Sequence, residues 1–194
     1  MRIVRLWMRN AQELNRKNSR PAAFRGARYN GRVSFKIRPF QTRDFDTLWG
    51  IDQICFEPPL AYSKMELAVY MRRAGSFTLV AEMADVSGEN RAGVLGFVVA
   101  ESRRESGHII TIDVIPEARR NGLGSALLSA AESRLRSQGA LEVALETAVN
   151  NLSAIRFYKK HGYFIEKTIP GYYSNHLDAL VMKKELSGEA VSSP

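Results

Sequence analysis

Two arginines and two glycines, Arg119, Arg120, Gly122 and Gly124, stand at the start of an expected amphipathic helix at 123–138. Glycine weakens a helix by roughly 1 kcal/mol relative to alanine, so two glycines here indicate a purpose other than helix formation. The first turn of a helix has unpaired backbone N–H groups and a partial positive charge. Glycines let a ligand approach that backbone, and they permit the positive φ angles that gather N–H groups into a nest. With the arginines, they predict an anion site suited to a phosphate or pyrophosphate.

This motif differs from two common phosphate-binding loops. No Lys followed by Ser or Thr comes after the glycines, as a Walker loop requires. Leu127 follows where a dinucleotide fingerprint has its third glycine. An apolar strand at 107–115 leads into the motif and a helix follows it, and this setting favours a phosphate loop over a chance match.

The composition is that of an ordinary globular protein, with 194 residues, 45% apolar and 25% charged. The chain has no apolar run of 18 residues, so no membrane contact is expected. The single Cys55 excludes an intramolecular disulfide and favours a reducing, cytoplasmic location. This cysteine and the three histidines show no ligand spacing, so no metal site is expected.

The positive charge is concentrated at the start of the chain. Residues 1–32 hold nine Lys and Arg but one acidic residue, Glu13, so they account for the whole formal net charge of +8. We expect three parts: a basic, flexible arm at 1–32, one domain at 33–186 and a disordered tail at 187–194. The arm is either a plain extension, or the product of a start codon set too far upstream, or a weak contact for RNA or the ribosome.

Alternating periodicities predict an α/β domain with a mixed sheet in the order β-α-α-β-β-β-α-β-α-β-β. Thr42 is expected to cap the first helix, Ser63 with Glu66 the second, and Gly139 to end the third. The three strands before the phosphate loop predict an antiparallel meander. The expected strands are 33–39, 76–83, 92–101, 107–115, 141–147, 163–168 and 177–185, and the expected helices are 42–56, 63–73, 123–138 and 151–161.

The loop and this order of elements resemble the GNAT superfamily of acetyl-CoA-dependent N-acetyltransferases. The stretch Arg119-Arg120-Asn121-Gly122-Leu123-Gly124 looks like the pyrophosphate motif of that family. Within it, the chain looks most like the ribosomal-protein alanine N-acetyltransferase (RimI-like) group and its archaeal relatives. That group has a Glu, an Asn and a Tyr at the spacing of Glu146, Asn151 and Tyr158. It often has Pro-Trp-Ser after its first helix, where this chain has Tyr62 in place of Trp.

The resemblance implies a GNAT-type sheet flanked by helices and acetyl-CoA as co-substrate. It also implies that the backbone at Val114 and Ile115 pairs with the pantetheine amides. The residues implied to bind acetyl-CoA are Val114, Ile115, Arg119, Arg120, Asn121, Gly122, Leu123, Gly124, Ser125, Asn151 and Tyr158.

Two side chains are implied to carry the chemistry. Glu146 ends a strand beside the cofactor, where it could take the amine proton directly or through water, although a solvated strand-end carboxylate remains the alternative. Tyr158 could donate to the CoA sulfur, with a core aromatic as the alternative. Asn151 could serve only as a helix N-cap.

Four further side chains that could take part in chemistry are expected to have no catalytic role. Asp113 is expected to be a surface carboxylate, and Cys55 a small core residue. His108 and His161 are expected to be structural.

The acceptor is expected to be the N-terminal α-amine of a protein or peptide. Phe56 and Tyr62 would form one wall of its site and Tyr172 and Tyr173 the other, unless these aromatics pack in the core. Two other functions stay open: a GNAT acting on a small-molecule amine, and a non-catalytic acetyl-CoA- or RNA-binding protein. The assembly is expected to be a monomer or a weak dimer.

Overall fold

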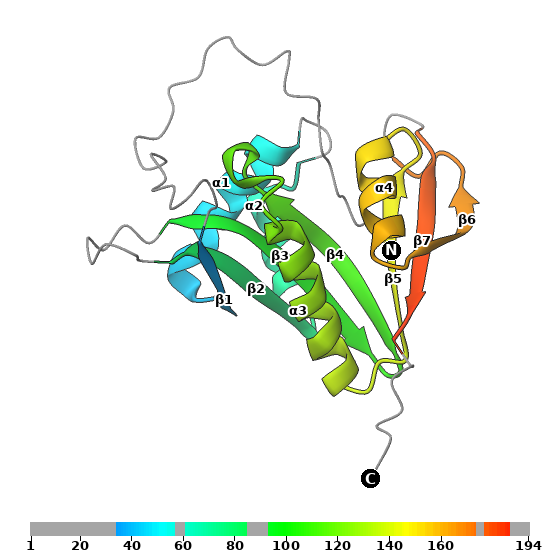
Figure 1. The fold of residues 1–194 in the computed structure, drawn as a ribbon, viewed down its shortest axis with the longest axis horizontal. Helices are drawn as coiled ribbons and strands as arrows, with labels where there is room; N and C mark the ends of the chain where they lie inside the picture. Colours follow the sequence, from blue (N-terminus) through cyan, green and yellow to red (C-terminus); the bar gives the residue numbers. More distant parts are fainter. Residues whose placement is uncertain (1–33, 57–60, 85–92, 174–176, 187–194) are drawn as a thin grey trace.

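The protein folds around one seven-stranded mixed sheet (Figure 1). The computed structural model describes residues 34–56, 61–84, 93–173 and 177–186. The sheet order is β1-β2-β3-β4-β5-β7-β6, and every neighbouring pair is antiparallel except β4 and β5. The strands are β1 (Phe35–Pro39), β2 (Ser76–Met83), β3 (Val94–Arg103), β4 (Ser106–Val114), β5 (Glu142–Ala148), β6 (Phe164–Ile169) and β7 (Ala179–Glu185). The predicted mixed sheet and its antiparallel meander are confirmed.

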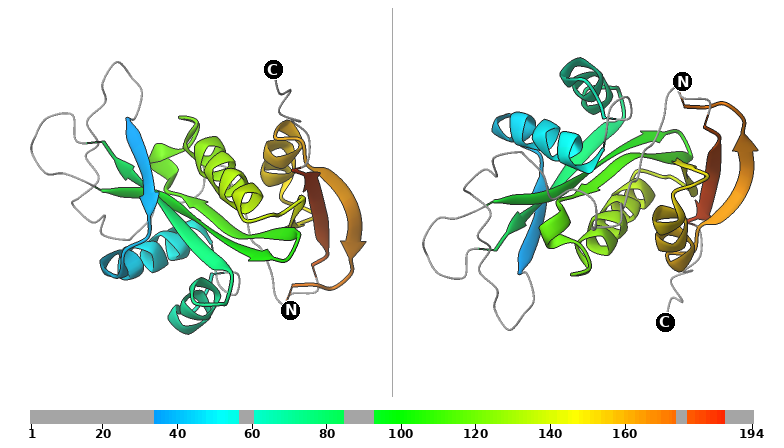
Figure 2. Two further views of the ribbon diagram at one scale, coloured as in Figure 1. Left: turned by 90° about the horizontal axis from the view of Figure 1, so that it is seen from below. Right: turned by 90° about the horizontal axis from the view of Figure 1, so that it is seen from above.

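Helices cover both faces of this sheet. Figure 2 shows α1 and α2 on one face and α3 and α4 on the other. The helices are α1 (Phe45–Cys55), α2 (Lys64–Met71), α3 (Leu123–Ser137) and α4 (Leu152–Lys160), with short 3₁₀ turns η1 (Thr42–Asp44) and η2 (Pro116–Ala118). The predicted order of elements is therefore confirmed. In the part of the chain that the structure describes, no helix has the length and apolar character to cross a membrane.

The helix ends follow local sequence rules with one exception. Ser63 and Glu66 form the predicted capping box at the start of α2. Gly139 has a φ of 89° just after α3, as expected for a C′ glycine. The prediction for Thr42 is wrong, because Gln41 caps a 3₁₀ turn that begins at Thr42 and leads into α1. A 3₁₀ turn before a helix moves its cap by several residues, which periodicity does not reveal.

The sheet opens between β4 and β5. Only Ser106–His108 of β4 pair with Glu142–Ala144 of β5. Beyond that short ladder the two strands diverge, as the ribbon shows (Figure 1). The carboxyl-terminal halves of both strands therefore line a gap in the middle of the sheet, which we call the β4–β5 gap.

A bulge in β4 decides which side chains face α1. Val99 of β3 pairs with Thr111, but the next residue, Ala100, pairs with Ile109, so Ile110 is the extra residue. Without a bulge, side chains five residues apart would point to opposite faces. The extra residue brings His108 and Asp113 to the same face of the sheet, away from α3.

A charged network ties β1 to its neighbours. Arg38 donates to Asp44 at 2.7 and 3.0 Å and to Glu82 at 2.9 Å. Burial raises the pKa of Asp44, but hydrogen bonds from Arg38 and from the Gln41 N–H outweigh it, so this pKa lies below its ordinary value. The hydrogen bond from Arg38 also holds the pKa of Glu82 below its ordinary value. The Arg38 side chain is 16% exposed, so its loss would leave the largely buried Asp44 and Glu82 carboxylates without their guanidinium partner.

We expect Arg38→Met to lower the free energy of unfolding at pH 7 by about 3 kcal/mol, the cost of leaving a buried charge without its partner. Both carboxyl pKa values are lower in the folded state than in the unfolded state. Their stabilising effect is therefore present above about pH 4 and is lost as the pH falls through the folded values. Urea unfolding should thus show a larger deficit at pH 7 than at pH 3. The exposed Lys36→Met, which removes a 3.4 Å contact with Glu82, is the control and should cost less than about 1 kcal/mol. Equal deficits of Arg38→Met at both pH values would contradict this account.

Candidate active site

The turn before α3 has the backbone of an anion nest. Arg120 has a φ of 63° and Gly122 a φ of 80°, so both lie in the left-handed region. Gly122 is the N-cap of α3 but has no side chain to accept the first N–H groups of the helix. A Cβ atom at Gly122 would meet no atom within 4 Å. Open space therefore lies beside Gly122 at the start of α3, where the first-turn N–H groups could bind the pyrophosphate of acetyl-CoA.

The arginines of the motif have different positions. Arg119 does not extend its guanidinium into the nest: its Nε donates to Val114 O at 2.9 Å and its terminal NH2 group contacts Cys55 Sγ at 3.5 Å. Arg119 thus links the loop to the end of β4 and to α1. The side-chain amide of Asn121 donates hydrogen bonds to Ala118 O and Arg119 O, which stabilise the conformation of the loop. Arg120 is exposed, where its charge can act on a bound anion.

Three other predicted cofactor residues lie in the first turn of α3. Leu123 is 1% exposed and packs in the core, so only its backbone can meet the cofactor. A Cβ at Gly124 would lie 3.6 Å from the ring of Phe157 in α4, an ordinary contact distance. Ser125 Oγ lies 2.9 Å from His161 Nε2. The end of α4 therefore packs directly against the turn that forms the nest.

Of the two residues whose backbone was predicted to pair with pantetheine, Val114 faces the β4–β5 gap and Ile115 does not. The N–H of Ile115 donates to Leu95 O in β3 at 3.0 Å. Because alternate residues of a strand turn their backbone groups to opposite edges, Val114 faces away from β3 and toward the gap. The carbonyl of Val114 accepts from Arg119, so its N–H is the group best placed to meet a pantetheine amide.

Tyr158 is fully buried, and its hydroxyl makes no hydrogen bond in the structure. A buried hydroxyl normally has a partner, because leaving it unpaired costs about 1–3 kcal/mol. Burial raises the pKa of this phenol well above its ordinary value, and the nearby charge of Asp113 raises it further. The group is therefore neutral, and its hydroxyl keeps a proton for hydrogen bonding.

The prediction that Asp113 is a surface carboxylate is wrong. Asp113 is 1% exposed, and its Oδ1 accepts from Thr111 Oγ1 at 3.1 Å. Its Oδ2 makes no hydrogen bond. Burial and the neighbouring Asp52 of α1, which is also fully buried, raise its pKa well above the ordinary value. The β4 bulge and the cover provided by α1 explain the burial, and neither is visible in the local pattern.

Glu146 contacts His108, a pairing that the sequence analysis did not predict. Glu146 Oε2 lies 2.9 Å from His108 Nε2, across the opening between β5 and β4. The side chains are 13% and 31% exposed respectively, so solvent or a substrate can reach them. Two groups able to accept a proton thus lie at the gap, on the face away from α3. The sequence placed His108 on a strand but gave no sign of its register against β5.

Asn151 caps the N-terminus of α4, the structural alternative given for it above. It is the N-cap of α4, with its Oδ1 accepting from Ala154 N at 3.1 Å, and it is 5% exposed. A role toward acetyl-CoA stays a prediction.

Three of the four predicted acceptor aromatics pack in the interior. Phe56 and Tyr62 are each 4% exposed within the main core, and Tyr173 is 3% exposed beside Ala148. Tyr172 is half-buried, with its ring 5.3 Å from that of Tyr173. Residues 57–60 and 174–176 of the same two loops lie outside the described residues. In the structure these side chains therefore pack as ordinary aromatic residues, the alternative that the sequence left open. Their binding of an acceptor stays a prediction.

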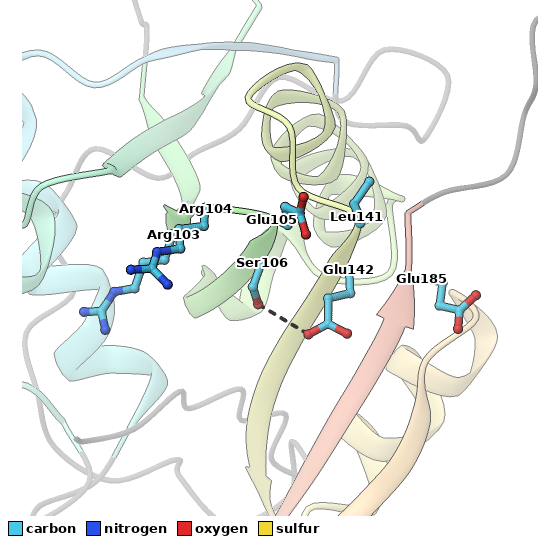
Figure 3. A pocket seen from close by; sticks show the side chains of 7 residues that line it. All are labelled: Arg103, Arg104, Glu105, Ser106, Leu141, Glu142 and Glu185. Carbon is cyan, nitrogen blue, oxygen red and sulfur yellow. Dashed lines mark hydrogen bonds between the residues drawn. The ribbon is translucent and has the colours of Figure 1, made fainter.

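A separate hollow lies at the other end of β4 and β5 (Figure 3). It has a volume of about 520 Å³ and is distant from the diverging strand ends. It is lined by Arg103, Arg104, Glu105, Ser106, Leu141, Glu142 and Glu185. None of the residues predicted for the acetyl-CoA site lies in it. Among the described residues, His, Cys, Asp and Glu do not gather in a group of three or more that could hold a metal ion.

Comparison with known sequences identifies the family. The pattern of the acetyltransferase (GNAT) family matches residues 39–163. An N-acetyltransferase of Methanocaldococcus jannaschii is 31% identical over 150 residues, which are 77% of this chain and 90% of that one. N-alpha-acetyltransferase 20 of Dictyostelium discoideum is 33% identical over 122 residues, 62% of this chain and 70% of its own. The chain belongs to the GNAT acetyltransferase family: it is an N-acetyltransferase, and acetyl-CoA is its acyl donor.

Solved structures agree with this assignment. Ard1 from Thermoplasma volcanium superposes with a TM-score of 0.69 at 31% identity, covering 79% of this chain and 98% of that one. The ribosomal-protein-S18-alanine N-acetyltransferase of Escherichia coli has a TM-score of 0.67 at 20% identity over 82% of this chain and 99% of its own, which shows a shared fold. The predicted GNAT-type fold is confirmed. The RimI-like grouping stays a prediction.

Proposed function

We propose that this enzyme acetylates the N-terminal α-amine of a protein or peptide by direct attack on acetyl-CoA. The observation that carries the proposal is the Glu146–His108 pair at the β4–β5 gap. The buried Tyr158 hydroxyl, which makes no hydrogen bond, supports it. Relatives above 30% identity that are themselves named N-alpha-acetyltransferases support the same acceptor.

The reaction needs one group to take a proton and another to give one. The amine nitrogen attacks the thioester carbon, and the C–S bond breaks as the amide forms. Glu146, hydrogen-bonded to His108, accepts the proton that the amine loses, directly or through a water. Tyr158 stabilises the departing thiolate by a hydrogen bond from its hydroxyl. Val114 N–H and the nest at the start of α3 hold the pantetheine and pyrophosphate parts of the donor.

The acceptor class follows from amine basicity. An α-amine has a pKa of about 7.7–8.0 and a lysine of about 10.4. At pH 7 about one α-amine in ten is neutral, against roughly one lysine in 2,500, a difference of about 3.5 kcal/mol. A site with a single carboxylate–histidine pair suits the more easily deprotonated amine.

A panel of acceptors tests the proposal. One peptide carries a free α-amine and no lysine, and a second has a blocked N-terminus and one internal lysine. Spermidine and free amino acids represent small amines. Mass spectrometry should show acetylation of the first peptide at a rate at least tenfold above all the others. Preference for a small amine would support a small-molecule GNAT instead, and the absence of any CoA release would support a binding protein.

Two finer assignments belong with this proposal. The RimI-like grouping predicts a preference for peptides that begin with alanine, whereas relatives named as catalytic subunits of N-terminal acetyltransferase B favour a different grouping. Including several first residues in the panel separates them. A weak contact of the basic arm with RNA or the ribosome also stays a proposal, and residues 1–32 lie outside the described part of the chain.

A further inference from the structure

A histidine that takes no part in the proposed reaction connects the nest at the start of α3 with the end of α4. His161 Nε2 lies 2.9 Å from Ser125 Oγ, in the first turn of α3. The ring of Phe157 packs edge-on against His161, with centroids 4.6 Å apart, and also lies beneath Gly124. His161 is therefore fixed beside the site where the pyrophosphate is expected.

We propose that His161 positions the Ser125 hydroxyl to donate a hydrogen bond to the pyrophosphate of acetyl-CoA, and that cofactor binding recruits a proton to this imidazole. The proposal rests on the acetyl-CoA site at the start of α3 and deepens it. His161 acts through Ser125 and is a positioning residue.

The contact permits two arrangements of protons. In one, the serine hydroxyl donates to an unprotonated Nε2, and it then has no proton to offer a phosphate. In the other, Nε2–H donates to Ser125 Oγ, and the hydroxyl is free to donate outward. A phosphate oxygen at the nest selects the second arrangement. A fully protonated imidazole fixes it and adds a positive charge near the anion.

The surroundings disfavour the protonated form of His161 in the free enzyme. Burial lowers its pKa below the ordinary value near 6.5, and Lys184 of β7 and Lys160 of α4 lower it further. Glu132 of α3 acts in the opposite direction, but it is engaged with Lys184 at Nζ and Tyr163 at Oη. A bound pyrophosphate would add negative charge on the Ser125 side and should raise this pKa.

Linkage sets the direction of the pH effect. If the pKa of His161 is higher in the complex than in the free enzyme, affinity increases as the pH falls through the higher value. It becomes constant below the lower value. Each unit of that rise makes the protonated enzyme about tenfold tighter for the ligand than the neutral enzyme.

The probe is 3′-dephospho-CoA, because a phosphate monoester has a second pKa near 6 that would titrate in the same range. Calorimetry from pH 5.5 to 8.0 should show the Kd falling at least fivefold toward low pH in the wild type. His161→Gln should give a flat profile, because its amide N–H donates to Ser125 at every pH. Ser125→Ala should bind more weakly, and its Kd should depend less on pH than that of the wild type, because His161 then has no hydroxyl to position.

A second measurement follows the protonation of the imidazole directly in the wild-type enzyme. Proton NMR of the imidazole C2–H signals, with and without 3′-dephospho-CoA, should show an increase in the pKa of one histidine, assigned to His161 by its absence in His161→Gln. A wild-type Kd that is independent of pH, or a pKa of His161 that the ligand does not raise, would overturn the proposal and leave His161 as a packing residue.

The binding experiment contains no acceptor amine. Failure to acetylate any peptide would contradict the proposed function and leave the Kd profile intact. A flat Kd profile in an enzyme that acetylates peptides would contradict only the role of His161.

Discussion

Glu146→Gln should lower kcat at pH 7 by roughly 10² to 10⁴, the usual contribution of a general base. The amide cannot accept the amine proton. It has nearly the same shape and can still form a hydrogen bond to His108 Nε2, so the local structure should persist. The Kd for acetyl-CoA should hardly change, because Glu146 lies on β5, away from the nest at α3. Steady-state kinetics on a lysine-free peptide, with calorimetry for acetyl-CoA, measure the two effects separately.

The pH dependence identifies the role of this carboxylate. Above pH 9 an α-amine deprotonates without help, so the Glu146→Gln deficit should shrink there. Tyr158→Phe is the comparison variant: it removes only a hydroxyl, and it should reduce kcat by a factor that high pH does not restore. Because that hydroxyl is buried without a partner, Tyr158→Phe should leave the melting temperature unchanged or higher. A Glu146→Gln deficit that stays constant from pH 6.5 to 9.5, with chemistry rate-limiting, would place the base elsewhere.

The features that the sequence predicted correctly depend on neighbours along the chain. The Gly122 turn, the α3 face that packs on the sheet and the Ser63 cap each arise within a few residues. Alternation and turn residues were enough to predict the strands. Local chemistry also indicated a phosphate loop at Gly122 and Gly124, and its binding of a phosphate stays a prediction.

The features that the sequence did not reveal depend on contacts between distant residues. The extra residue Ile110 in β4 brings His108 and Asp113 to one face, and no local pattern distinguishes a bulged strand from a regular one. The contact of His108 with Glu146 depends on the register of a parallel pair only three residues long. Asp113 is buried because α1 covers it.

Side-chain direction was the other source of difference. Arg119 was expected to contribute charge to the nest, but its guanidinium lies against Val114 O and Cys55. If an anion binds at this turn, Arg120 and the helix start are left to supply the positive charge. The sequence indicates the loop, but the direction of each of its side chains depends on the tertiary structure.

Gly124→Glu should abolish the rise in melting temperature that acetyl-CoA produces, and with it peptide acetylation. The new carboxylate would lie in the first turn of α3, where the pyrophosphate needs backbone N–H groups and positive charge. Repulsion between the two anions and the volume of the side chain act in the same direction. Thermal denaturation with and without acetyl-CoA measures the loss.

Two variants separate loss of the site from loss of the fold. Gly124→Ala should keep most of the thermal shift, because its Cβ would lie 3.6 Å from Phe157 and Gly124 does not have a positive φ. Ser133→Glu adds the same charge at an exposed position of α3 and should leave the shift unchanged. If Gly124→Glu folds and binds CoA with the affinity of the wild type, the pyrophosphate does not lie at this turn. The role given to Ser125 and His161 would then fail with it, whereas the Glu146–His108 pair would still require a substrate at the β4–β5 gap.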